Sequence, residues 1–153
     1  MPTGTVVSIH IASTARGPMQ AVAASAAIPG AGLEGDRYAL KLGTFYKPGP
    51  DRELTLIEAE AIEALRRDYG IELAVGDARR NLVTRGVALN HLVGKEFTVG
   101  VVRIRGIRLC EPCGHLQTLA AKPVIKGLIH RGGLRAQVLT AGTIHAGDRV
   151  TVA

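Results

Sequence analysis

The stretch KEFTVGVVRIRGIRL, residues 95–109, carries the clearest strand pattern of the chain. Between Val102 and Arg105, apolar residues alternate with arginines, and this period of two places one set of side chains against a core and the other in solvent. Gly100 predicts the connection to the preceding strand, KEFTVG, and Gly106 predicts a β-bulge before the buried face continues. We therefore expect two neighbouring strands here, with a local irregularity in the second.

Short strands are also predicted towards both ends of the chain. The stretch TVVSIHIAS, residues 5–13, alternates in the same way, and MQAVAASAAI, residues 19–28, predicts a second short strand that ends at the turn-prone PGAG. The stretch LRAQVLTAGTIHAGDRVTV, residues 134–152, predicts two more strands joined by a glycine-containing turn. Residues 43–51, GTFYKPGPD, contain two prolines and two glycines and predict a loop.

One long helix is predicted in LTLIEAEAIEALRRDYG, residues 54–70. Thr55 and Glu58 match the T-x-x-E capping box, in which two side chains satisfy backbone donors at the start of a helix. Gly70 is suited to end the helix, because glycine readily adopts the left-handed conformation of a helix C-terminus. Four apolar residues recur on one face of this predicted helix: Ile57, Ala61, Ala64 and Leu65.

Many short strands with one long helix predict a mainly β fold. We expect a closed or nearly closed β-barrel with one long helix and a few short helices, and not a doubly wound sheet. The 153 residues contain no repeat and no linker long enough to divide them, so we expect a single domain over residues 1–153.

Composition narrows the class of protein. Hydrophobic residues make up 46% and charged residues 21% of the chain, which is typical of a globular protein and excludes disorder as the main state. No apolar run approaches the roughly 18–20 residues of a membrane helix, so no membrane association is expected. The N-terminus lacks the pattern of a signal peptide, and the chain has two cysteines, so we expect a cytoplasmic protein with reduced thiols.

The charge balance favours an anionic partner. Lys and Arg number 19 against 13 Asp and Glu. This excess suits nucleic acid, a phosphorylated cofactor or an acidic surface. Aromatic residues make up 3% of the chain, whereas proteins that bind single strands stack bases on aromatic side chains. A nucleic-acid partner is therefore not expected.

The two cysteines lie close together in IRLCEPCGHLQ, residues 107–117. A structural zinc site needs four cysteine or histidine ligands, and this stretch offers Cys110, Cys113 and His115. A redox dithiol of the thioredoxin type is a second interpretation, but it accompanies a βαβ pattern that is not seen here. A third interpretation makes Cys113 a single thiolate, acidified at a strand-to-helix junction, with Cys110 packed in the core. Spacing alone leaves all three open.

Two arginine-rich stretches could bind an anion, because the forked guanidinium group matches phosphate geometry. They are GDARRNLVTRG, residues 76–86, and IHRGGLRAQVL, residues 129–139. A strand in the first stretch would place at most half of its donors on one face, and a solvated edge strand explains this stretch equally well. A hairpin turn explains the second stretch equally well. A weaker signal is AGLEGDRYAL, residues 31–40, where Asp36 beside Arg37 could orient donors in a loop.

Taken in order, five stretches resemble a known family. They are GLEGDRY, ELTLIEAEAIEAL, GDARRNLVTRGVALNHLVGKEFTVG, RLCEPCGHL and RAQVLTAGTIHAGD. Together they are similar to the MOSC domain, named for the C-terminal portion of molybdenum cofactor sulfurase and also found as small stand-alone bacterial proteins. The resemblance extends from about residue 4 to residue 152 and implies a mainly β, barrel-like fold.

The resemblance also implies a function. EPCGHL fits best with Cys113 as the hallmark cysteine, which makes it the expected catalytic residue and molybdenum ligand. The implied cofactor is the molybdenum cofactor, molybdopterin with its metal, and the implied activity is reduction of N-hydroxylated compounds. The alternative is a sulfur carrier with a Cys113 persulfide. The expected donors to the cofactor are Arg79, Arg80, Asn81, Thr84, Arg131 and Arg135.

Partners follow from the same resemblance. Larger relatives carry a fused desulfurase or a further N-terminal β domain, so a cysteine desulfurase or a reductase is the expected partner. Pyridoxal phosphate appears among the family's labels, but no lysine lies in a motif that indicates a Schiff base.

Overall fold

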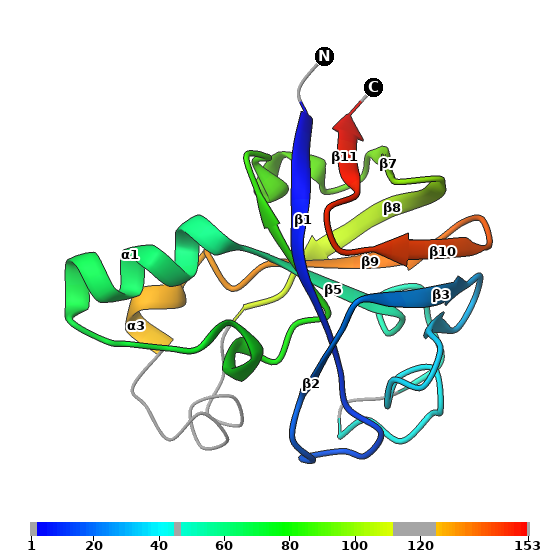
Figure 1. The fold of residues 1–153 in the computed structure, drawn as a ribbon, viewed down its shortest axis with the longest axis horizontal. Helices are drawn as coiled ribbons and strands as arrows, with labels where there is room; N and C mark the ends of the chain where they lie inside the picture. The colour runs from blue at the N-terminus through cyan, green and yellow to red at the C-terminus, as the bar shows by residue number, and fades with distance from the viewer. Residues whose placement is uncertain (1–2, 45–46, 112–124, 153) are drawn as a thin grey trace.

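The computed structural model describes residues 3–44, 47–111 and 125–152 of the chain. Its centre is a ring of seven strands, in which each strand pairs with the next and the last closes on the first (Figure 1). All neighbours are antiparallel except β5 and β6. The predicted closed β-barrel is confirmed. Around the ring the strands are β1 (Thr3–Ile11), β11 (Arg149–Val152), β7 (Glu96–Val99), β8 (Val102–Leu109), β9 (Leu134–Val138), β5 (Leu54–Glu58) and β6 (Leu82–Arg85).

The ring closes where β1 pairs with β11. Thr3 lies opposite Thr151 and Thr5 lies opposite Arg149, so strands from the two ends of the sequence are neighbours in space. The strand pair predicted from residues 95–109 is also present, and its register shifts between Gly106 and Arg108 as a bulge requires.

Four further short strands lie outside the ring. β2 (Gln20–Val22) extends β1, while β10 (Gly142–His145), β3 (Ala24–Ile28) and β4 (Gly32–Leu33) form a separate sheet. The prediction of one strand in residues 19–28 was wrong, because β2 and β3 pair with different partners. The prediction of two strands in residues 134–152 was also wrong, because β9, β10 and β11 are distinct strands.

The long helix α1 (Ala59–Tyr69) begins later than the sequence predicts. Thr55 lies in β5, Glu58 is the N-terminal capping residue but its side chain makes no capping hydrogen bond to the helix, and the predicted capping box is absent. Gly70 ends the helix in the left-handed conformation, with φ of 67°, as predicted. The other described helices are short: α3 (Ile125–Leu128) and the 3₁₀ turns η1 (Val75–Ala78) and η2 (Leu89–Leu92). No helix among the described residues is long and apolar enough to cross a membrane.

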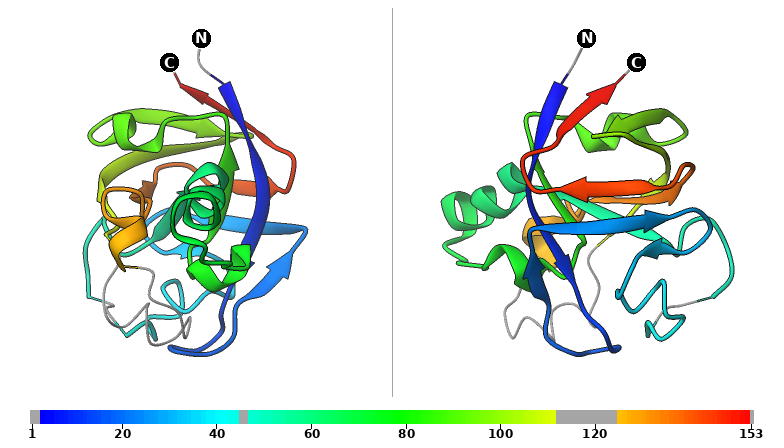
Figure 2. Two further views of the ribbon diagram at one scale, coloured as in Figure 1. Left: turned by 90° about the vertical axis from the view of Figure 1, so that its left-hand side faces the viewer. Right: turned by 45° about the vertical axis from the view of Figure 1, so that its right-hand side comes forward.

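The barrel wall separates two apolar clusters. Leu56 and Leu82 point into the barrel core, whereas their neighbours Ile57 and Val83 point outward to α1 and α3. The two helices pack together on this side of the barrel (Figure 2). Because side chains alternate along a strand, both faces of β5 become buried, which explains why its sequence reads LTLI and not as an apolar–polar alternation.

Candidate functional site

Five arginines of the barrel are connected through shared partners, and we call them the arginine cluster: Arg37, Arg79, Arg80, Arg108 and Arg135. They come from the turn after β4, the segment before β6, the end of β8 and the start of β9. Their contacts with carbonyl and carboxylate oxygens join these segments to one another.

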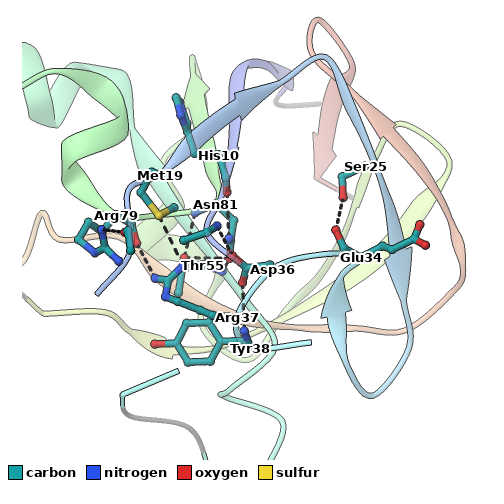
Figure 3. Close-up of polar contacts among 12 residues, drawn as sticks. His10, Met19, Ser25, Glu34, Asp36, Arg37, Tyr38, Thr55, Arg79 and Asn81 are labelled. Carbon is teal, nitrogen blue, oxygen red and sulfur yellow. Dashed lines mark hydrogen bonds and ion pairs between the residues drawn. The ribbon is translucent and has the colours of Figure 1, made fainter. Parts of the chain in front are cut away.

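A buried aspartate–arginine pair anchors the turn after β4 (Figure 3). Asp36 is fully buried, and its Oδ1 accepts hydrogen bonds from the Ala12 N–H at 3.1 Å and from Nη1 of Arg37 at 3.1 Å. Arg37 also donates through Nη2 to the Arg79 carbonyl at 3.3 Å, and its guanidinium lies 4.9 Å from the centre of the Tyr38 ring. The GDRY stretch therefore fixes β1 and the segment before β6 against one another.

Arg79 is half-buried in the left-handed conformation, with φ of 58°. Its Nη1 donates to the Gly17 carbonyl at 2.7 Å, and within the described residues its other guanidinium nitrogens have no hydrogen-bond partner. Burial lowers the pKa of Arg79, and the positive charge of the nearby Arg37 lowers it further. Arg79 is therefore a partly desolvated cation with donors that no described residue occupies.

Arg80 has a different role from its neighbour. It is 8% exposed, and its three guanidinium nitrogens donate to the carbonyls of Gly132 at 2.8 Å, Cys110 at 3.1 Å and Ala78 at 3.4 Å. The sequence predicts Arg80 as a donor to the cofactor, but the structure commits each of these nitrogens to the protein backbone. Arg80 therefore ties the end of β8 to the loop that precedes β9.

Cys110 is held by both of its backbone groups at this junction. Its N–H donates to the Gly133 carbonyl at 2.7 Å, and its carbonyl accepts from Arg80. The residue is 3% exposed, and its thiol is free, which confirms the prediction that Cys110 packs in the core.

Asn81 and Thr84 are fully buried and bonded to the barrel wall. The side-chain oxygen of Asn81 accepts from the N–H of Thr55 at 3.1 Å and from its hydroxyl at 3.2 Å, and its amide nitrogen donates to the His10 carbonyl at 3.1 Å (Figure 3). The Thr84 hydroxyl donates to the Ile57 carbonyl at 3.5 Å. Neither side chain has surface for a ligand in this structure, which leaves Arg79 as the accessible donor of the RRN segment.

Arg135 has a buried donor without a partner. Its Nη1 donates to the Asp51 carbonyl at 3.3 Å, whereas its Nε is buried and has no hydrogen bond among the described residues. Burial opposes the charge of Arg135, but the nearby Cys110, Tyr38 and Asp51 raise its pKa above the ordinary value. Asp51 in turn accepts from Nε of Arg108 at 2.8 Å, and that bond is the main reason why its pKa is lowered.

Sequence reasoning missed Tyr38, Asp51 and Arg108. These residues lie far apart in the chain and meet only because the barrel closes. The GDRY stretch, which contains Tyr38, was the one local signal for any of these three residues.

Arg131 lies at another place, where it lines a surface hollow together with residues of α1, with Glu58 at the end of β5 and with His91 of η2. No described contact joins it to Arg79 or Arg135. The neighbouring His130 binds Glu111, which accepts the backbone N–H of His130 at 2.7 Å and lies 2.8 Å from its Nδ1. The described contacts therefore do not bring the six predicted donors together at one place.

Cys113 and His115 belong to residues 112–124, as does the helix predicted after Cys113, and all three lie outside the described residues. Glu111 is the last described residue before them. Among the described residues, no group of three or more His, Cys, Asp or Glu side chains could hold a metal ion.

Solved structures with the same fold come from several bacteria. The YuaD protein from Bacillus subtilis is 15% identical, with a TM-score of 0.77 over 97% of this chain and 94% of that one. YiiM from Geobacillus stearothermophilus is 17% identical, with a TM-score of 0.75 over 98% and 75%. YiiM from Escherichia coli is 20% identical, with a TM-score of 0.68 over 100% and 70%. At such identities the likeness concerns the fold.

The sequence comparisons give the family. No curated protein matches the chain, and nothing in the comparisons supports a role for pyridoxal phosphate. The family model described as the MOSC domain matches residues 45–151, well over half of the chain, with β5–β9 and most of the arginine cluster inside the match. The chain therefore belongs to the MOSC domain family.

Proposed function

We propose that this MOSC protein binds the molybdenum cofactor with Cys113 as the molybdenum ligand, and that the loaded protein supports reduction of N-hydroxylated compounds. The family association with this cofactor supports the proposal. The observation that carries it is the arginine cluster: Arg135 keeps a buried donor that bonds to no described residue, near Cys110, which lies three residues before Cys113 in the chain.

The described residues fit the chemistry of this cofactor. Its phosphate and pterin need fixed donors, and Arg79 and Arg135 have guanidinium nitrogens that no described residue occupies. Guanidinium groups bind phosphate in a bidentate manner. Molybdenum held by dithiolene sulfurs suits one further soft thiolate, so a single cysteine is enough. A cluster of several protein ligands is not required.

When bound, the cofactor would supply a two-electron reduction, in which an N–OH group, two electrons and two protons give N–H and water. The electrons would come from a separate reductase. The chain's own residues have simpler roles. Arg80 and Gly133 hold the end of β8, from which the Cys113 segment departs, and Arg37 and Arg79 place positive charge for an anionic ligand.

The test compares Cys113→Ala with Cys110→Ala after expression in a host that makes the cofactor. We expect the purified wild type and Cys110→Ala to contain molybdenum and pterin, and Cys113→Ala to lose most of the metal. Loaded wild type with reduced methyl viologen should convert an amidoxime into the amidine. Equal metal content in wild type and Cys113→Ala would rule out the ligand assignment.

A second measurement on the same samples addresses sulfur transfer. After incubation with a cysteine desulfurase, a persulfide on Cys113 in protein that reduces no amidoxime would replace the reductase proposal with the sulfur-carrier alternative.

A further inference from the structure

The surface hollow beside α1 is not used by the arginine cluster. Its volume of about 390 Å³ falls in the range of small-molecule sites. We call it the helix-side hollow. Three separate parts of the chain line it: the start of α1, the η2 turn, and the segment that follows α3. The lining residues that matter below are Glu58, Glu60, Ala61, Ala88, His91 and Arg131.

One side of the helix-side hollow is acidic. Glu60 accepts the Gly86 N–H through Oε2 at 2.8 Å, while its Oε1 is buried and has no hydrogen-bond partner among the described residues. Glu58 accepts the Leu89 N–H at 3.1 Å. Burial, and then the proximity of Glu60, raise the pKa of Glu58. An unpaired buried acceptor is unfavourable by itself and is satisfied by a ligand that donates N–H groups.

The side chains that can bind an anionic group are Arg131, which is positively charged, and His91, whose ring can donate an N–H. Both are exposed, and neither side chain has a hydrogen bond within the described ranges. Both lie close enough to Glu58 to act electrostatically on its carboxylate. Other basic side chains of the lining are already occupied, since Arg67 forms two hydrogen bonds with Asp68 and His130 binds Glu111. Among the described residues of the lining, Arg131 and His91 are therefore the basic side chains available to an anionic group.

Part of the lining of the helix-side hollow is apolar. It includes Ala61 and Ala64 from successive turns of α1, and Ala88 from the segment before η2. Their small side chains leave space for the aliphatic body of a ligand.

We infer that the helix-side hollow binds a small zwitterion, with a guanidinium or ammonium group at Glu58 and Glu60 and a carboxylate at Arg131 and His91. A neutral ligand with separated charges matches this lining better than a polyanion, because two carboxylates lie in the same lining as Arg131 and His91. The inference does not depend on molybdenum, so protein without cofactor is suitable for its test.

The probe is 4-guanidinobutyrate, measured by calorimetry and by amide chemical shifts. Agmatine lacks its carboxylate, and butyrate lacks its guanidinium. We expect 4-guanidinobutyrate to bind at least about tenfold more tightly than either. No binding at concentrations up to about 10 mM would overturn the inference. Equal binding of butyrate would overturn it as well, because only an anion would then be recognised.

Variants locate the binding. Ala88→Leu fills the hollow from an exposed position, and we expect it to abolish binding without unfolding the protein. Glu60→Gln and Arg131→Gln should each weaken binding about tenfold. The matched controls are Glu63→Gln and Arg66→Gln, which change the same residue types outside the hollow and should bind as wild type does. Unchanged binding by Ala88→Leu and Arg131→Gln would overturn the assignment.

Discussion

The arginine cluster and the helix-side hollow use similar side chains in opposite ways. In the arginine cluster, Arg80 donates each of its nitrogens to backbone carbonyls, and Asn81 is bonded on both sides of its amide. In the helix-side hollow, Arg131 keeps its guanidinium free, and Glu60 keeps an unpaired oxygen among the described residues. In the first region most donors hold segments of the barrel together, and only Arg79 and Arg135 keep nitrogens that no described residue occupies, while in the second the charged groups lie around a hollow.

Gly133→Ala should have the largest effect, because the segment that Arg80 holds through the Gly132 carbonyl packs closely against the backbone of β5 at Gly133. Gly133 has φ of +108°, and an added Cβ would overlap the carbonyl oxygen of Leu56. We expect a loss of about 3 kcal/mol or more in the free energy of unfolding, measured by urea denaturation. Gly147→Ala is the control, because its φ is +94° but nothing lies within 4 Å, so about 1–2 kcal/mol is expected. Equal losses would show that the contact with Leu56 is unimportant.

Arg80→Gln should come second. The substitution leaves the carbonyls of Cys110 and Gly132 without their buried donor, and we expect a loss of about 2–4 kcal/mol. Arg131→Gln in the helix-side hollow should change stability little, since that side chain is exposed. Thermal and urea unfolding of the pair give a direct comparison of the two regions. Similar stabilities for both variants would contradict the structural role assigned to Arg80.

The smallest predicted effects concern how the free energy of unfolding depends on pH, and they have opposite signs for His10 and Glu58. Burial lowers the pKa of His10, next to the arginine cluster, below 6.5, so the unfolded chain binds its proton more readily. The stability that neutral His10 provides is present above pH 6.5 and is lost as the pH falls towards the lowered value. Wild type should therefore lose this part of its stability on acidification, and His10→Gln should lose less.

Glu58 behaves in the reverse sense. Burial raises its pKa above 4.5, so the folded protein binds the proton more readily. The contribution of Glu58 to the free energy of unfolding is largest below pH 4.5 and is lost as the pH rises through its raised pKa in the folded protein. We expect Glu58→Gln to gain stability relative to wild type as the pH rises, in unfolding measured across the same pH series. If the stabilities of wild type and Glu58→Gln change with pH in parallel, Glu58 has the same pKa in the folded and the unfolded protein, which would contradict this prediction.

Much of the fold could be predicted because its signals are local. Alternation in residues 95–109 and the glycines at positions 70, 100 and 106 predicted strands, a bulge and a helix end that are all present. The capping box was wrong because Thr55 and Glu58 have stronger partners elsewhere. The Thr55 hydroxyl bonds to Asn81 across the β5–β6 pair, and the Glu58 carboxylate accepts from Leu89. Such partners are far away in sequence.

The candidate site was less accessible to prediction for the same reason. Arg79 and Arg80 are adjacent and chemically identical, yet the left-handed backbone at Arg79 sends the two side chains to different surroundings. The assembly of Tyr38, Asp51 and Arg135 requires closure of the barrel and has no local signature. The roles expected of Cys113 and His115 remain predictions, because both lie outside the described residues.

The pairing of β1 with β11 has a consequence for synthesis of the protein. Thr3 meets Thr151 across almost the whole length of the chain, so this contact cannot form until β11 has left the ribosome. Until then, β1 and β7 each expose an unpaired edge, which is the kind of surface that recruits chaperones or other nascent chains. Loop closure over such a separation also slows folding. Translation of β11 therefore determines when the barrel can close and cover these two strand edges.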